Sequence, residues 1–244
     1  MKEKMYVVQL RSTIFLQQNI GYTPESEERF KKLLMPGSMA FGIPQPNMPI
    51  FGVNPNDPQY GMPWRLFQKN DEGEYNIAFQ LGKIDVVLTT EVLYGGDAET
   101  LFCNKSIEWF TKILEIQRQA VTRSAYAPLY AIMKDESNFI WENLLKKTIY
   151  DGAQSQDINL SFLLKRIIDF GGKDIQMNLL HNIFDGNQIK NEGLSSIVRK
   201  VLLLQLDLNS VPENNLQLDE KGIAAFYNNI LDIKCNLIDN VTKE

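Results

Sequence analysis

Histidine is nearly absent from this chain of 244 residues, which contains only His181. A single imidazole excludes every multi-histidine metal site and weakens the case for a histidine-based hydrolytic mechanism. His181 falls at the same strand parity as Ile175, Met177, Leu179 and Ile183. This position favours a packed, hydrogen-bonded sheet residue over a metal ligand or a catalytic base.

Cysteine is also scarce, since Cys103 and Cys235 are the only two. This count excludes a disulfide framework and a cysteine-rich zinc site, and leaves room for one disulfide at most. Cys103 lies just before a helix expected from about Asn104, where a helix N-terminus would lower the pKa of its thiol. Next to Phe102, however, a lone cysteine is more often a small buried residue. We expect no cofactor.

Several familiar signatures are missing as well. The sequence contains no GxGxxG after a strand and no GxxxxGK[ST], GxSxG or HExxH motif. It has no apolar run near the roughly 20 residues that a membrane-spanning helix needs, and its N-terminus lacks the apolar core of a signal peptide. We therefore expect a cytoplasmic protein with no membrane partner. The net charge of −5 makes nucleic acid an unlikely partner, because that interaction needs clustered basic residues.

A strand–loop–helix pattern occurs twice. The apolar stretch Tyr75–Thr90 leads through a Gly-Gly loop into a broad amphipathic helix, and Val201–Leu208 leads through a polar loop into a long helix that Asp219 caps. This internal repeat predicts an α+β fold of two similar halves, each an antiparallel β-sheet covered on one face by helices. The expected halves are residues 1–150 and 151–244, the second holding a β-hairpin, a central strand and the long helix.

Alternating apolar residues define further strands. We expect strands at Met5–Leu16, Ser124–Met133 and Asp157–Phe170, the last forming a hairpin with a strand that ends at residues 185–187. Within Tyr75–Thr90 the apolar parity changes at Gly82, which predicts a β-bulge there. Thr23-Pro24 predicts the start of a helix, and Ser137 could cap a short one.

Residues 35–63 form a Pro- and Met-rich segment, because seven of the ten prolines lie between Met35 and Trp64. Proline excludes a regular helix or a central strand here, so we expect a long loop. Two interpretations remain open: the loop packs on its own core, or it contacts a partner peptide or a second subunit. In the second case the binding residues would be Phe41, Ile43, Met48, Ile50, Phe51 and Tyr60.

Only the carboxylates suggest an enzyme. Asp85 and Asp207 lie in the two repeated strands, and Glu91 and Asp97 follow the first of them. Clustered acids can hold Mg²⁺ for phosphoryl chemistry, so a metal-dependent hydrolase or nuclease using Asp85 and Asp207 is the alternative function. The spacing of these carboxylates is not diagnostic of a metal site, so we expect instead a non-catalytic binding or assembly protein, contacting a protein partner or a second copy in a homodimer. The contact surface would be residues 35–63 with a sheet edge or the C-terminal helix.

The order of segments resembles a sporadically distributed prokaryotic protein family of about 250 residues. The resemblance covers most of the chain after Pro63 and rests on four stretches: WRLFQKNDEGEYNIAFQLGKIDVVLTT with the helix SIEWFTKIL, then VTRSAYAPLYAI, VLLLQLDLNSVPE and GIAAFYNNILDIKCNLIDNVT. It implies a genomic association with mobile or defence-related genes. The family has no established activity, so the resemblance assigns no functional residues.

Overall fold

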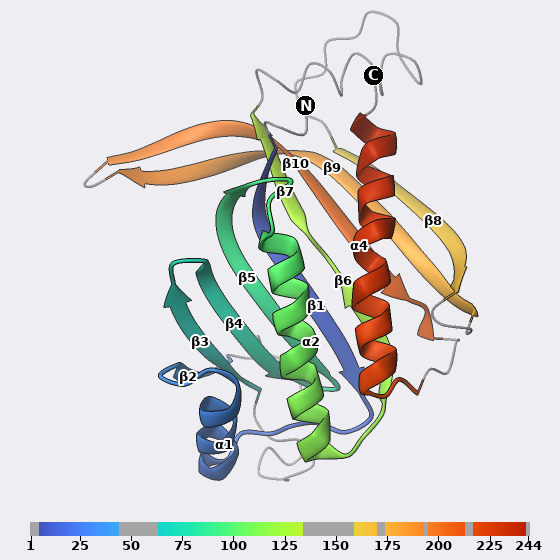
Figure 1. The fold of residues 1–244 in the computed structure, drawn as a ribbon. Coiled ribbons are helices and arrows are strands. Elements are labelled where there is room, and N and C mark those ends of the chain that lie inside the picture. Colours follow the sequence, from blue (N-terminus) through green and yellow to red (C-terminus); the bar gives the residue numbers. More distant parts are fainter. Residues whose placement is uncertain are drawn as a thin grey trace, which may run out of the picture.

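The computed structural model describes residues 5–43, 63–133, 159–169, 174–192, 195–212 and 217–242. Its strands form one antiparallel sheet of ten, in the order β2-β3-β4-β5-β1-β6-β10-β9-β8, with β7 pairing both β1 and β10 (Figure 1). The expected α+β class is confirmed, and both expected halves contribute to this one sheet. The strands are β1 Met5–Leu16, β2 Met39–Gly42, β3 Trp64–Asn70, β4 Gly73–Gln80, β5 Lys83–Leu93, β6 Val121–Tyr126, β7 Leu129–Met133, β8 Asn159–Asp169, β9 Asp174–Glu192 and β10 Ser195–Ser210.

The described helices all pack on one face of this sheet. They are α1 Pro24–Leu34, α2 Ala98–Gln117 and α4 Glu220–Thr242. The two long ones, α2 and α4, lie side by side across the middle strands (Figure 1). We call the covered side the helix face and the other side the open face. None of the described helices is long and apolar enough to cross a membrane.

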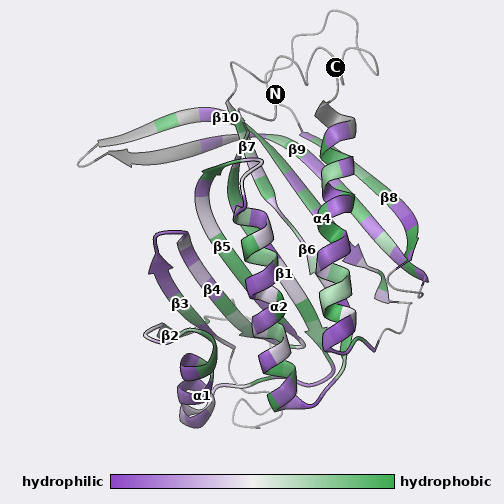
Figure 2. Cartoon of the chain, in the orientation of Figure 1, coloured by the Kyte–Doolittle hydropathy of each residue, from purple (hydrophilic) through white to green (hydrophobic). Residues whose placement is uncertain are grey.

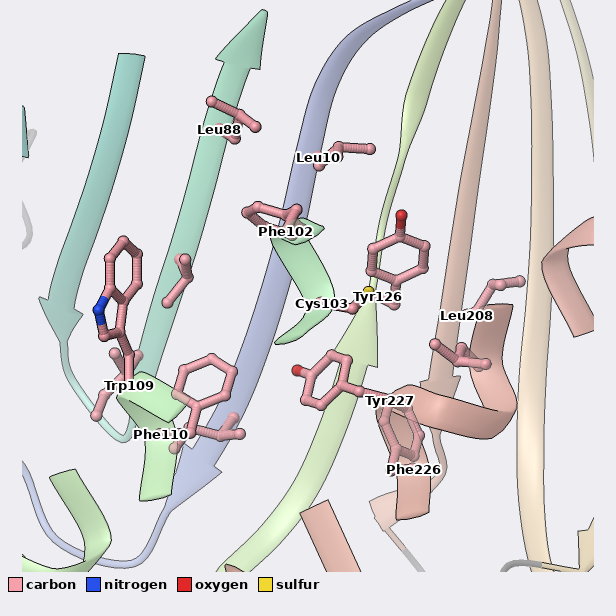
Figure 3. Close-up of a cluster of buried hydrophobic side chains, with 14 of the residues drawn as sticks. Leu10, Leu88, Phe102, Cys103, Trp109, Phe110, Tyr126, Leu208, Phe226 and Tyr227 are labelled. Carbon is pink, nitrogen blue, oxygen red and sulfur yellow. The ribbon is translucent and has the colours of Figure 1, made fainter. Parts of the chain in front are cut away.

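The core lies between the helix face and α2 and α4. Leu10 of β1 and Tyr126 of β6 point toward Phe102 and Phe110 of α2 and Tyr227 of α4, and all five side chains are buried (Figure 3). The rings of Phe110 and Tyr227 stack with centroids 5.8 Å apart. Figure 2 shows hydrophobic and hydrophilic residues alternating along α2 and α4, and the buried hydrophobic ones, Phe110 and Tyr227 among them, belong to the core. Burial of these large apolar surfaces is the main stabilising term of the fold.

The local signals at three element starts are confirmed. Strand β1 covers the predicted Met5–Leu16. Helix α1 begins with a capping box, in which the side chains of Thr23 and Ser26 each accept from the other residue's backbone N–H. Asp219 caps α4 through the Gly222 N–H, 2.9 Å from its Oδ1.

The predicted bulge at Gly82 is wrong. Residues 75–90 form two strands, β4 and β5, joined by a tight turn in which Gln80 pairs with Lys83. Gly82 has φ +66°, a left-handed conformation that glycine adopts without steric cost. A two-residue reversal shifts the apolar parity just as a bulge would, so alternation alone does not distinguish them.

Two other strands also differ from expectation. The predicted strand 124–133 is divided into β6 and β7 at Ala127-Pro128, because proline cannot donate a ladder hydrogen bond. Inside the Pro- and Met-rich segment, residues 39–42 form the edge strand β2, which pairs with β3. Residues 44–62 of that segment, and the expected cap Ser137, lie outside the described residues.

The predicted strand end at residues 185–187 is wrong as well. Strand β9 continues to Glu192 and pairs with β10 throughout. Past Phe184 and Val201 these two strands have no other described neighbour, and Figure 1 shows them projecting as an arm. Gly186 marks a close approach and not a turn, since an added Cβ would lie 2.5 Å from Leu203 Cδ1.

Candidate functional site

The sheet ends at β8, whose outer side pairs with no strand in the described part of the chain. Four large apolar side chains of this edge strand are exposed, with Ile167 at 72% and Leu163 at 56% the most accessible. The other two are Phe162 and Leu164, each 44% exposed. Figure 2 shows hydrophobic segments along this edge. A long edge strand with exposed apolar side chains is a template for pairing with another chain.

These apolar residues occupy both faces of β8. Phe162 pairs with His181 and so lies on the helix face, whereas Leu163 pairs with Leu180 and lies on the open face with Ile167. Edge strands that resist association usually carry charges on their exposed positions. Between Phe162 and Ile168 only Lys165 and Arg166 are charged, so apolar surface dominates this part of the edge.

The opposite edge, β2, holds the described part of the predicted binding segment. Phe41 is 42% exposed and meets Phe67 edge-on, with ring centroids 6.4 Å apart. The Arg65 guanidinium lies over the Phe41 ring at 5.7 Å. The backbone N–H of Ile43 donates to the Pro63 carbonyl at 2.9 Å. Phe41 and Ile43 thus lie at this edge, while Met48, Ile50, Phe51 and Tyr60 lie outside the described residues.

Asp85 is a buried carboxylate on the open face of β5. The Thr13 hydroxyl donates to one of its oxygens at 2.6 Å and the Gln80 amide to the other at 2.9 Å. Lys83 Nζ lies 3.1 Å from the second oxygen. These donors satisfy and neutralise the carboxylate, as buried charges require, so the arrangement is that of a structural anchor between β1, β4 and β5.

Asp207 lies on the same open face but on β10, and its Oδ1 accepts a hydrogen bond from the Asn209 amide at 2.9 Å. Strands β1 and β6 separate it from Asp85, a lateral distance of roughly 14 Å at the usual strand spacing. One metal ion bridges far shorter distances between its ligands. Among the residues that the structure describes, no three His, Cys, Asp or Glu side chains lie together as a metal site would require.

A buried ion pair joins the two long helices. Lys234 Nζ of α4 lies 2.7 Å from Oε2 of Glu99 on α2, and both side chains are less than a tenth exposed. The hydroxyls of Tyr130 and Tyr126 donate to the other Glu99 oxygen at 2.6 and 3.1 Å. Lys234 also lies over the Tyr94 ring at 4.9 Å. Burial, with the Glu99 carboxylate as a further cause, raises the pKa of Tyr126 and Tyr130 well above the usual range.

Sequence reasoning missed this network, although one signal was present. Lys234 falls four residues after Ile230 on the apolar stripe of α4, a position at which a charged residue needs a buried partner. Nothing in the sequence pointed to Glu99 as that partner. Both Glu99 oxygens accept from described donors and Lys234 Nζ is paired with one of them, so the cluster acts as a structural link between the two helices.

Cys103 does not have the features of a reactive thiol. Helix α2 begins at Ala98, so Cys103 lies in its second turn and not at its N-terminus as predicted. Burial, followed by the nearby Glu99 carboxylate, raises the pKa of the Cys103 thiol to about 12. A thiol with a raised pKa stays protonated and unreactive at neutral pH. Cys235 is free and exposed on α4.

His181 is buried on the helix face of β9, as expected, but its Nε2 has no hydrogen-bond partner among the described residues. Burial first, and then the charge of Arg166, lowers its pKa below the ordinary 6.5. The neutral ring is therefore favoured in the fold. As the pH falls below 6.5, the unfolded chain binds a proton that the folded chain resists, and stability is lost.

Replacing His181 with leucine is expected to raise the free energy of unfolding by up to about 1 kcal/mol at neutral pH, because a buried ring nitrogen without a hydrogen-bond partner among the described residues disappears. The variant should also lose less stability between pH 7 and pH 5 than the wild type. Urea unfolding at both pH values measures the two effects. A steeper acid slope in the variant would contradict this assignment.

The edge strand β8 was predicted, but its two-sided apolar character was overlooked. Alternation through Leu160, Phe162, Leu164 and Ile168 fits a half-buried strand, while the consecutive runs FLL and RII place apolar residues on the second face as well. Such runs were the available signal for an exposed contact surface.

The chain matches no protein-family model and no curated protein sequence.

Proposed function

We propose that this chain is a non-catalytic binding or assembly protein and that its principal contact surface is the edge strand β8. The observation that carries the proposal is the exposure of Phe162, Leu163, Leu164 and Ile167 on one unpaired edge. Adding a strand from another chain would satisfy the outer backbone groups of β8 and cover these side chains. Backbone pairing would supply a large share of the affinity, and the apolar side chains would supply specificity.

The position of the C-terminal helix supports this choice of surface. The apolar stripe of α4 is buried, with Ile223, Phe226, Ile230 and Leu237 all packed in the core. A helix with its stripe already covered has little apolar surface left for a seam between subunits. Between the C-terminal helix and a sheet edge, the sheet edge is therefore the better supported contact surface.

We also infer that the fold contains two copies of one structural unit. The strand order supports this: β3-β4-β5-β1 on one side of the sheet is mirrored by β8-β9-β10-β6 on the other. In both units three consecutive antiparallel strands precede a long helix, α2 or α4. Strands β3 and β8 are then equivalent. The outer side of β3 is covered by β2, whereas the outer side of β8 pairs with no described strand. This difference singles out β8 as the contact edge.

The test is a charge placed on β8. Leu164→Lys is expected to weaken association at least tenfold, about 1.4 kcal/mol, because it places a cation in a surface that must lose its water. Native mass spectrometry of the protein taken gently from its host lysate should show a bound polypeptide with the wild type but not with the variant. The bound polypeptide can be another protein or a second copy of this chain.

Leu101→Lys is the matched control, because Leu101 is equally apolar and 55% exposed but lies on α2, away from β8. It should retain the second polypeptide. Circular dichroism and the thermal midpoint of both variants should match those of the wild type. A wild-type protein without any bound polypeptide, or a Leu164→Lys variant that keeps its partner, would contradict the proposed function.

A further inference from the structure

We propose that the chain covering β8 is a second copy of this protein, and that the two β8 strands pair antiparallel about a two-fold axis that passes midway between the two copies of Leu164. This inference rests on the proposed function and names its partner. The resulting dimer would carry one continuous sheet, formed by joining the β8 edges of two ten-stranded sheets. Because both copies use the same edge, the interface is isologous and closes at two subunits.

The geometry of strand pairing limits the choices. Two side-by-side antiparallel strands of identical sheets are related by an axis perpendicular to the sheet. Residues opposite each other then share a face. Because side chains alternate between faces, one residue must lie directly opposite its own copy, with the axis midway between the two. Each such residue defines one register, so the candidates near the middle of β8 are those centred on residues 163 to 167.

The sequence of β8 favours the register centred on Leu164. It is the middle residue of the strand Asn159–Asp169, so this register alone pairs all 11 residues. Centring the axis on Lys165 or Arg166 would place two like charges directly opposite each other, which destabilises a sheet. Centring it on 163 or 167 shortens the paired segment.

Side-chain pairs across the Leu164 register are complementary. On the helix face, Leu160 would lie opposite Ile168 of the second copy and Phe162 opposite its Arg166. The guanidinium of Arg166 could then lie over the Phe162 ring, an arrangement already present in this fold where Arg123 lies 4.8 Å from the Phe15 centroid. On the open face, Ile167 would lie opposite Ser161, and Lys165 opposite Leu163. No like charges oppose each other in any of these pairs.

Cysteine cross-linking tests both the partner and the register. In a Cys235→Ser background, which removes the exposed native thiol, Leu164→Cys places one cysteine opposite its own copy. Opposed residues in antiparallel strands have Cα atoms about 4.5–5.5 Å apart, within the range of a disulfide. Mild oxidation should convert most of this variant into a covalent dimer.

Ile167→Cys in the same background is the matched control, because Ile167 is exposed yet would lie roughly 20 Å from its own copy along the strands. It should remain uncross-linked alone. Mixed with Ser161→Cys, it should form the heterodimeric disulfide that the register requires. Sedimentation of the wild type should show a dimer that Leu164→Lys dissociates.

The outcomes separate this inference from the proposed function. A wild type that sediments as a monomer at every concentration, but carries a different polypeptide in native mass spectrometry, would overturn the second-copy assignment and leave the proposed function standing. A dimer that cross-links through Ile167→Cys alone, and not through Leu164→Cys, would overturn the register. A monomer with no bound polypeptide would overturn both.

Discussion

Replacing Lys234 with methionine is expected to lower the free energy of unfolding by about 3–5 kcal/mol. The substitution removes one member of a buried ion pair. It leaves the Glu99 carboxylate in the core with two tyrosine hydroxyls as its remaining donors among the described residues. An uncompensated buried charge is among the most destabilising changes that a single substitution can cause. Methionine fills a similar volume, so lost packing contributes little.

A double variant separates the charge from the packing. Glu99→Gln removes the negative charge but keeps an oxygen that accepts from Tyr126 and Tyr130, so Glu99→Gln with Lys234→Met should recover most of the loss. Lys112→Met is the surface control: Lys112 pairs with Glu108 on the exposed side of α2, and such pairs contribute about 0.3–0.5 kcal/mol.

Guanidinium unfolding at one fixed protein concentration measures these differences, because any self-association adds a concentration-dependent term. If Lys234→Met costs no more than Lys112→Met, the pair does not stabilise the fold as the geometry implies. A double variant no more stable than Lys234→Met alone would show that packing, and not charge, explains the loss.

Elements with strong local signals could be predicted from the sequence. Alternation fixed the bounds of β1, and the Thr23 and Asp219 caps fixed the starts of α1 and α4. Each of these signals depends on residues only a few positions apart. The α+β class followed from the same patterns, because strands and long amphipathic helices must cover one another.

Features that depend on distant residues could not be predicted. A bulge, a tight turn and a strand break all leave similar marks on alternation, so Gly82 and Pro128 were ambiguous. Gly186 looked like a turn because its role depends on Leu203 across the hairpin. Glu99 and Lys234 are 135 positions apart, and no local pattern connects them. The exposed surface of β8 became visible only when the structure placed that strand at an edge.

Tyr227→Ala is expected to lower the free energy of unfolding by about 3–5 kcal/mol, because it removes a fully buried aromatic side chain and leaves a cavity. Tyr227 lies where α4, α2 and the middle of the sheet meet (Figure 3). Its hydroxyl is 3.0 Å from the carbonyl oxygen of Thr13 on β1 and 3.1 Å from that of Ala125 on β6. These two residues pair across the boundary between the proposed structural units.

Tyr227→Phe divides the effect into ring and hydroxyl. It keeps the stacking against Phe110 but leaves the two carbonyl oxygens without this donor, so it should cost about 1–2 kcal/mol. Hydrogen exchange locates the loss: in Tyr227→Phe, protection should fall mainly in β1 and β6, because the hydroxyl contacts one carbonyl oxygen in each of these strands. If exchange increases equally in all strands, Tyr227 acts only through its volume, and the hydroxyl does not specifically join the two units.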